Sequence, residues 1–135
     1  MTTTLAEMID AQRLRPGISD IHIHVGRAMA VRVDGDIEMC PDCVVDQAAF
    51  DGFFQTYLSA EQRARFESHG DVDLAIVIND QRYRASVAKG SRGHVVVLRL
   101  LATKIPQLED LNLPPVLHTV SDIASGLVLV TGPTG

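Results

Sequence analysis

Alternation of apolar and polar residues is the first clear pattern in the chain. Along residues 19–26 every second side chain is apolar, so Ile21 and Ile23 share one face of an extended segment while His22 and His24 share the other. A strand of this kind packs its apolar face on a core and leaves the other face accessible. We therefore predict a half-buried strand here.

Further segments have the same period and are separated by turn residues. Asp34 and Gly35 stand between two β-rich arms within residues 29–38, and Asp-Gly is a preferred hairpin turn because both positions must tolerate positive φ. Three later strands are predicted, with turns at residues 79–80 and 90–93 between them: residues 72–78, 82–88 and 94–101.

Helical periodicity marks three stretches. Thr4 and Glu7 have the spacing of a capping box ahead of an apolar stripe that stops near Arg15. Ser59 and Gln62 have the same spacing ahead of a short polar helix. Asp46 can cap a helix between these two, with a regular apolar stripe: Phe50, Phe53, Phe54, Tyr57 and Leu58. Antiparallel strands with inserted helices predict an α+β domain over residues 1–101.

The pattern changes after the last of these strands. Periodicity fades and prolines interrupt residues 102–114, which predicts a linker. Pro115 suits the first turn of a helix that runs toward Ser121, and the uncharged apolar run at residues 127–130 predicts a buried strand. We expect residues 115–135 to begin a second, α/β domain.

A glycine-rich turn follows this apolar run. Gly132, Pro133, Thr134 and Gly135 are candidates for binding a phosphate, because glycines let backbone N–H groups curl around an anion. A complete loop of this kind also needs a lysine for the outer phosphates and a Ser or Thr hydroxyl for magnesium, and neither follows Gly135. An ordinary turn is the alternative interpretation.

Composition narrows the classes of function. The 135 residues are 46% hydrophobic, and the net charge of −5 argues against a general nucleic-acid binder. We find no apolar run of membrane-spanning length and no N-terminal charged-then-apolar signal, so we expect a soluble cytoplasmic protein. The two cysteines are too few for a disulfide scaffold and fit a reducing compartment.

These cysteines, Cys40 and Cys43, have the spacing of a zinc half-site or a redox pair, and His22 and His24 lie on a strand that could be close to them. A closed zinc site needs four ligands, and a redox pair is expected at a helix N-terminus. We therefore interpret the pair as structural or incidental and predict no metal site. A small zinc or redox protein is kept as a further hypothesis.

Two arginines are expected to face each other on adjacent strands. If residues 91–92 form the tip of a hairpin, Arg84 pairs with Arg99, and Arg82 lies on the same face opposite Leu101. Directly opposed like charges destabilise a sheet, so facing arginines indicate a carboxylate or phosphate near them in the assembled state. The alternative is that both side chains lie in solvent or pair with a nearby Asp or Glu.

Four short motifs occur in order along the chain. They are Ser-Asp-Ile-His-Ile at residues 19–23, Val-Arg-Val-Asp-Gly-Asp at residues 31–36, the arginines of residues 82–99, and the terminal residues 126–135. Their order and spacing resemble the opening strand, the hairpin, the arginine-bearing strands and the first half of the Walker A loop of the type IV pilus retraction ATPases, within the secretion ATPase superfamily. The resemblance covers nearly the whole chain.

The resemblance implies a PAS-like antiparallel sheet with helices, a linker, and the first helix and strand of a truncated RecA-like domain. It also implies a cytoplasmic homo-hexamer that uses ATP and Mg²⁺ and associates peripherally with the inner membrane through a platform protein of the pilus or secretion machinery. In this family ATP lies between the two domains, and arginines of the N-terminal domain reach its phosphates. The motif places these catalytic arginines at Arg84 and Arg99, with Arg82 as a further nucleotide-binding residue.

Several kinds of protein fit these expectations. A retraction motor, its accessory paralogue and a related secretion ATPase share the motifs. The alternative from a different class is a stand-alone PAS-like sensory or protein-interaction module, in which the terminal turn is incidental. We expect the chain by itself to bind no cofactor and to be inactive, because its nucleotide loop lacks the lysine and the hydroxyl.

Overall fold

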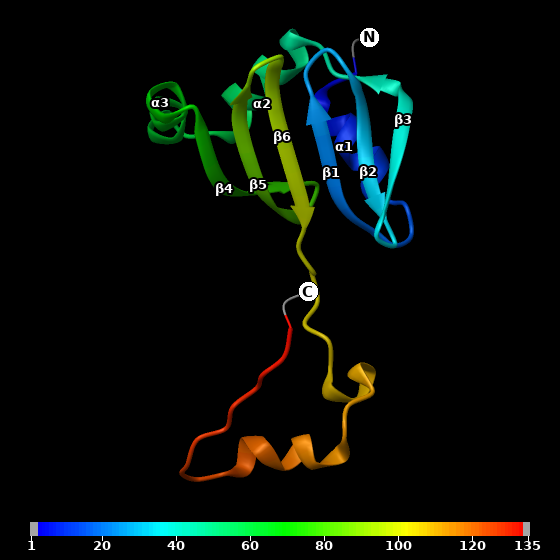
Figure 1. The fold of residues 1–135 in the computed structure, drawn as a ribbon, viewed down its shortest axis with the longest axis vertical. Coiled ribbons are helices and arrows are strands. Elements are labelled where there is room, and N and C mark those ends of the chain that lie inside the picture. Colours follow the sequence, from blue (N-terminus) through cyan, green and yellow to red (C-terminus); the bar gives the residue numbers. More distant parts are fainter. Residues whose placement is uncertain (1–2, 134–135) are drawn as a thin grey trace. The chain divides into compact units, whose positions relative to one another are not determined.

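The computed structural model describes residues 3–133. It divides the chain into two compact units, one up to Thr103 and one from Lys104 onward, and each is described by itself. The first unit is built on a six-stranded antiparallel sheet with the order β3-β2-β1-β6-β5-β4 (Figure 1). Its strands are β1 (Ile18–His24), β2 (Ala28–Val33), β3 (Asp36–Val44), β4 (Asp71–Ile78), β5 (Gln81–Gly90) and β6 (Gly93–Leu100). Its helices are α1 (Leu5–Arg13), α2 (Gln47–Tyr57) and α3 (Ala60–His69).

Two three-stranded meanders form the sheet. Strands β1, β2 and β3 follow one another through short turns, as do β4, β5 and β6. The two meanders join in the middle of the sheet, where β1 pairs with β6. Helices α2 and α3 carry the chain from β3 at one edge to β4 at the other, so residues of β1 and β6 become neighbours although they are far apart in sequence.

The tight turns form at the expected residues. Asp34 and Gly35 have φ angles of 49° and 93°, which a two-residue turn with positive φ at both positions requires. Asn79 and Asp80 have φ angles of 45° and 63°, and Asn and Asp are the non-glycine residues that adopt this region most readily. The predictions of these two hairpins are confirmed.

The helices begin at their predicted caps, and α3 also ends at the predicted glycine. The Thr4 hydroxyl accepts a hydrogen bond from the Glu7 N–H, and the Glu7 carboxylate accepts one from the Thr4 N–H, which completes a capping box. Ser59 and Gln62 form a second capping box, and Gly70 ends α3 with a φ of 85°. Within residues 3–133, no helix combines the length and the apolar character that a membrane span requires.

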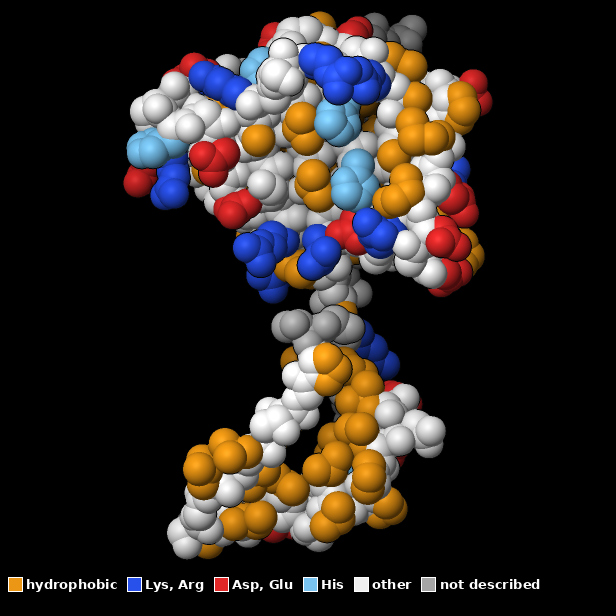
Figure 2. All heavy atoms as spheres, in the orientation of Figure 1, with side chains coloured by type: hydrophobic (Ala, Val, Ile, Leu, Met, Phe, Trp, Pro, Cys, Tyr) orange, Lys and Arg blue, Asp and Glu red, His pale blue; other side chains and the backbone are white. Residues whose placement is uncertain are grey.

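One face of the sheet carries the hydrophobic core. Helices α1 and α2 lie behind the sheet in Figure 1, and sheet residues such as Ile21, Tyr83 and Leu98 are fully buried in the core. The aromatic stripe of α2 packs into it as predicted, with Phe50 and Phe53 almost fully buried. No helix of the described first unit covers the opposite face, which Figure 2 shows from the front.

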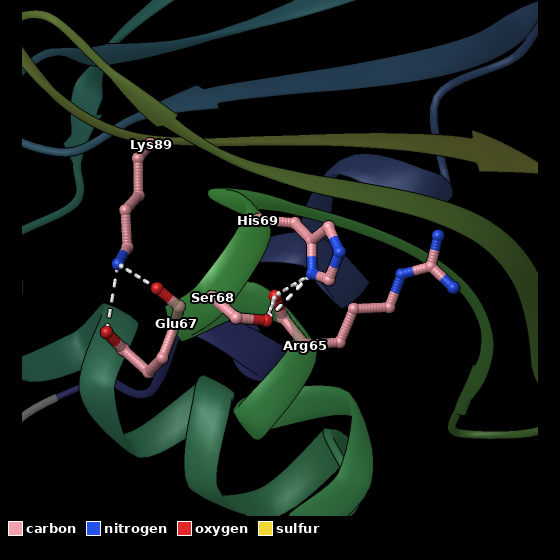
Figure 3. Close-up of polar contacts among 5 residues, drawn as sticks. All are labelled: Arg65, Glu67, Ser68, His69 and Lys89. Carbon is pink, nitrogen blue, oxygen red and sulfur yellow. Dashed lines mark hydrogen bonds and ion pairs between the residues drawn. The ribbon is translucent and has the colours of Figure 1, made fainter.

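Polar contacts fasten the last turn of α3 to β5 (Figure 3). The Lys89 ammonium donates a hydrogen bond to the Glu67 carboxylate at 2.9 Å. Ser68 Oγ lies 2.7 Å from His69 Nδ1, and both atoms also contact the carbonyl oxygen of Arg65. Polar side chains that bind the last carbonyls stabilise a helix end. We therefore assign a structural role to this cluster.

The second unit contains two 3₁₀ helices, η1 (Leu108–Leu111) and η2 (Pro115–Asp122). The predicted helix does begin at Pro115, but it is a 3₁₀ helix. Residues 127–130, for which a buried strand was expected, are exposed and form no strand. A buried strand needs neighbouring strands for its backbone groups and apolar surface for its side chains, and the described residues of this unit supply neither.

Candidate functional site

A row of charged side chains crosses the uncovered face of the sheet. The strand registers place Arg32 of β2 opposite Asp20 of β1. Asp20 also lies opposite Arg99 of β6, and Arg99 lies opposite Arg84 of β5. Residues in register on neighbouring strands project from the same face, so these four residues form one line, which we call the charged row. In Figure 2, basic and acidic side chains gather along one margin of this face.

Asp20 is the centre of the charged row. Its Oδ1 accepts a hydrogen bond from Nε of Arg99 at 2.9 Å, and its Oδ2 accepts one from the Ser19 hydroxyl at 2.7 Å. Nε of Arg32 lies 3.5 Å from Oδ2. The Asp20 side chain is only 5% exposed, so it is a buried anion held between two cations that are themselves partly exposed.

Two opposing effects set the pKa of Asp20. Burial disfavours the charged carboxylate and by itself raises the pKa. The hydrogen bonds from Ser19 and Arg99, together with the positive charge of Arg99, outweigh burial and leave the pKa below the ordinary value of 3.8. Asp20 is therefore ionised at neutral pH and attracts Arg99.

Arg84 and Arg99 both present N–H donors on the uncovered face of the sheet. Arg99 uses Nε to bind Asp20, and its terminal nitrogens make no hydrogen bond within residues 3–133. Arg84 is exposed, and its guanidinium pairs with no described residue. An open pocket of about 230 Å³ has a lining of both arginines and of four further residues: Asp20, Asp73, Ser86 and Val97. Guanidinium groups with free donors suit a phosphate or a carboxylate.

The structure brings the predicted arginines together. The register of β5 and β6 confirms that Arg84 faces Arg99. The carbonyl of Arg82 accepts the N–H of Leu101 at 3.0 Å, which agrees with the predicted pairing, although the Arg82 side chain does not line the pocket. The alternative interpretation, in which an arginine pairs with a nearby carboxylate, holds for Arg99, which binds Asp20. The positive charge of Arg84 remains exposed.

The sequence alone does not identify Asp20 as a site residue. A signal was present, because Asp20 shares one face of β1 with His22 and His24 in the alternating pattern. Arg99, however, is 79 positions away in the sequence, and only the pairing of β1 with β6 makes it a neighbour. The sheet order was needed to identify this contact.

The glycine-rich turn belongs to the second unit. Gly132 and Pro133 are exposed and lie outside regular secondary structure. Thr134 and Gly135 lie outside the described residues. The phosphate-binding role of these four residues therefore stays a prediction.

Other parts of the first unit offer less chemistry. Within residues 3–133, no three His, Cys, Asp or Glu side chains gather where they could hold a metal ion. A larger cavity of about 460 Å³ between the start of α1 and α2 is mostly apolar, with Leu5, Phe53 and Tyr57 in its wall. The carboxylate of this cavity, Asp46, already accepts the Ala49 N–H as the N-cap of α2. We therefore place the candidate site at the charged row.

Known proteins resemble the chain over most of its length, although no family model matches it. The type IV pilus retraction ATPase PilT of Pseudomonas aeruginosa is 31% identical over 122 residues, which are 90% of this chain and 36% of the relative. The uncharacterised protein YggR of Escherichia coli is 33% identical over 130 residues, 96% of this chain and 39% of the relative. A twitching motility protein of Neisseria gonorrhoeae is 27% identical over 108 residues, 78% of this chain and 28% of the relative. The chain thus spans well under half the length of these relatives.

Solved structures agree with the sequence relatives. A crystal structure of the pilus retraction motor PilT with bound ADP has a TM-score of 0.83 and 33% identity, and the match covers 99% of this chain and 39% of that chain. The Legionella pneumophila ATPase DotB, at 21% identity and a TM-score of 0.57, supports the fold alone; the match covers 84% of this chain and 32% of that chain. Sequence and fold together show that this chain is a homologue of the N-terminal part of the type IV pilus retraction ATPases.

Proposed function

We propose that the chain is the N-terminal domain, with the start of the motor domain, of a hexameric ATPase that powers pilus retraction or a related secretion process. In this proposal residues 1–101 form the N-terminal domain, residues 102–114 the linker and residues 115–135 the start of a RecA-like domain. The similarity to a pilus retraction motor over 99% of the chain supports it. Because the chain spans 36% of the Pseudomonas aeruginosa relative, ATP hydrolysis is proposed for the whole protein.

The adjacent arginines Arg84 and Arg99 carry the proposal, and we assign them to the phosphate groups of ATP. They lie in register on neighbouring strands, and Asp20 holds Arg99 by Nε, which leaves the terminal nitrogens to face an anion. Paired strands hold the two guanidiniums more precisely than a loop would. Negative charge develops on the transferred phosphoryl oxygens during hydrolysis, and arginines placed there stabilise the transition state more than the ground state.

The donors of the charged row fit a phosphate and do not fit a metal ion. Arg84 and Arg99 supply N–H groups and positive charge, which are what phosphate oxygens accept. For Mg²⁺, residues 3–133 provide no cluster of carboxylates, so we assign no residue of this chain to the metal. ATP is the phosphate compound proposed, with the backbone of residues 132–135 contacting it from the motor domain and Arg82 making a weaker contact.

We place the whole protein in the cytoplasm as a homo-hexamer on the inner-membrane platform protein of a pilus or secretion machine. The support is the similarity to a pilus retraction ATPase and a twitching motility protein. Nucleic acid is not a proposed partner, because the net charge of −5 opposes general binding to phosphate backbones.

The test is ATP hydrolysis by a chimera in which this chain replaces the corresponding N-terminal part of the Pseudomonas aeruginosa relative. Arg84→Ala and Arg99→Ala should each lower kcat, on the order of a thousandfold, with little change in KM, because these contacts strengthen in the transition state. Arg82→Ala is the comparison variant: it removes the same charge from the strand of Arg84, and it should lower kcat much less, because Arg82 lies outside the pocket lining and its proposed contact is weaker. Circular dichroism should show that every variant is folded.

Turnover near that of the unsubstituted chimera in both arginine variants would refute the phosphate role. If Arg82→Ala lowered kcat as much as the other two, general surface charge rather than a defined contact would account for the effect.

A further inference from the structure

The cysteine pair lies in an irregular part of β3. Met29 of β2 pairs with Cys40, whereas the preceding residue, Ala28, pairs with Val44. Pro41, Asp42 and Cys43 therefore form a bulge between these two pairs. In a regular strand, residues three positions apart project from opposite faces. A bulge re-aims a side chain, and here it turns both cysteines toward the core, where Cys40 is buried and Cys43 is half-buried.

The amide of Gln12 links the two sulfurs. Sγ of Cys40 donates a hydrogen bond to Oε1 of Gln12 at 3.4 Å, and Nε2 of Gln12 donates one to Sγ of Cys43 at 3.5 Å. Gln12 lies near the end of α1 and is only 8% exposed. Because one planar amide contacts both sulfurs, the two thiols lie on the same side of β3, within reach of one side chain.

We propose that Cys40 and Cys43 form a dithiol–disulfide exchange site that takes low-molecular-weight disulfides as its oxidant. Both cysteines are free thiols in the structure. The shared amide and the bulge are the arrangement that the spacing alone did not reveal, and they make the pair more than an incidental feature of the sequence. The inference is independent of the function proposed for the arginines.

The two cysteines have different parts in the exchange. Cys43 is the more exposed, so its thiolate attacks the small disulfide and forms a mixed disulfide, releasing one thiolate. Cys40 then loses its proton and attacks Sγ of Cys43, which forms the internal disulfide and releases the second thiolate. The released thiolates take up the two protons from the cysteines. The protein loses two electrons and two protons, and the small disulfide is reduced to two thiols.

Burial has a predictable effect on the second step. It raises the pKa of Cys40, an effect to which Cys43 and Glu38 add and which the positive charge of Arg15 opposes. A raised pKa leaves less thiolate to attack. The attack of Cys40 on the mixed disulfide must therefore be favoured by the fixed positions of the two sulfurs, as in other intramolecular reactions. Ring closure should thus be favoured in the folded chain relative to the unfolded chain.

The experiment equilibrates the full chain with mixtures of reduced and oxidised glutathione, followed by acid quenching and mass spectrometry. The wild type should become lighter by two hydrogen atoms. Cys40→Ser should stop at a glutathione adduct on Cys43, and Cys43→Ser should keep its buried thiol free. The equilibrium constant for the internal disulfide should be at least about tenfold higher for the folded chain than for the chain in urea.

Three results would overturn the proposal: a persistent glutathione adduct on the wild type, no reaction of Cys43, or an equilibrium constant no higher than in urea. Gln12→Met tests the amide, because methionine has a similar size but cannot make these two hydrogen bonds. We expect slower ring closure in this variant, with unchanged circular dichroism. Closure as fast as in the wild type would show that the amide does not position the thiols.

Discussion

Nε of Arg99 lies 2.9 Å from Oδ1 of Asp20, although the two residues are 79 positions apart in the sequence. The contact joins β6 to β1, the strands at which the two meanders meet. Asp20 is almost fully buried, whereas Arg99 reaches the surface. The pair therefore stabilises the middle of the sheet and also orients an arginine proposed to contact phosphate.

Replacing Asp20 by Asn tests the contribution of this pair to stability. The substitution keeps the size of the side chain and removes its charge. We expect the free energy of unfolding to fall by about 2 kcal/mol at pH 7, because hydrogen bonds to charged groups contribute about 1.5–3 kcal/mol. Urea unfolding of both proteins measures the difference, with circular dichroism as the check on the fold.

The pH dependence of that difference has a defined sign. The pKa of Asp20 in the folded protein lies below the ordinary value of 3.8, so between the two values the unfolded chain binds more protons. The contribution of the carboxylate is complete above pH 3.8 and is lost as the pH falls through the folded pKa. The difference in the free energy of unfolding between the wild type and Asp20→Asn should become smaller in this acidic range. A difference that stays constant over this pH range would contradict the lowered pKa of Asp20.

In the ATPase chimera, Asp20 should act on turnover only by positioning Arg99. We expect Asp20→Asn to lower kcat by about tenfold with little change in KM, because the loosened guanidinium spends less time in the productive orientation. Adding Asp20→Asn to Arg99→Ala should then cause no further loss of kcat, since the residue through which Asp20 acts is already absent. Additive losses in the double variant would refute a positioning role.

The chain by itself should show no magnesium-dependent ATP hydrolysis. The glycine-rich turn lacks the lysine and hydroxyl that engage the outer phosphates and the metal, and the two arginines cannot replace them. We also expect a monomer by light scattering, because the ring contacts proposed for the whole protein depend largely on the motor domain. Turnover that copurifies with the chain through several columns, or a stable hexamer, would show these expectations to be wrong.

Phe66 should be one of the most sensitive core positions. Its ring is 1% exposed and lies edge-on to Phe54 with 5.0 Å between ring centres, so it ties α3 to α2. Phe66→Ala should lower the free energy of unfolding by about 3–5 kcal/mol through lost burial and a cavity. Leu14→Ala is the control: Leu14 is 71% exposed, and its truncation should change stability by less than about 0.5 kcal/mol. Equal effects in urea unfolding would mean that α3 is not packed as described.

Short stretches of sequence are enough to specify the local structure of the first unit. Hairpins form at Asp34-Gly35 and at Asn79-Asp80 because these residues tolerate positive φ, and helices start at Thr4 and Ser59 because side chains a few positions away satisfy their first N–H groups. The position of one turn was also enough to predict that Arg84 faces Arg99. Interactions within a few residues, or across one tight turn, depend on residues that a short window of sequence contains.

The contacts between distant segments depend on how the whole chain folds. The pairing of β1 with β6 placed Asp20 against Arg99, and the bulge in β3 brought Cys40 and Cys43 to the same amide. The apolar run at residues 127–130 has the composition of a strand but forms none, because no described segment pairs with it. Alternation specifies which face of a strand is apolar, but the neighbours of that strand depend on which edges and faces the whole chain can bury together.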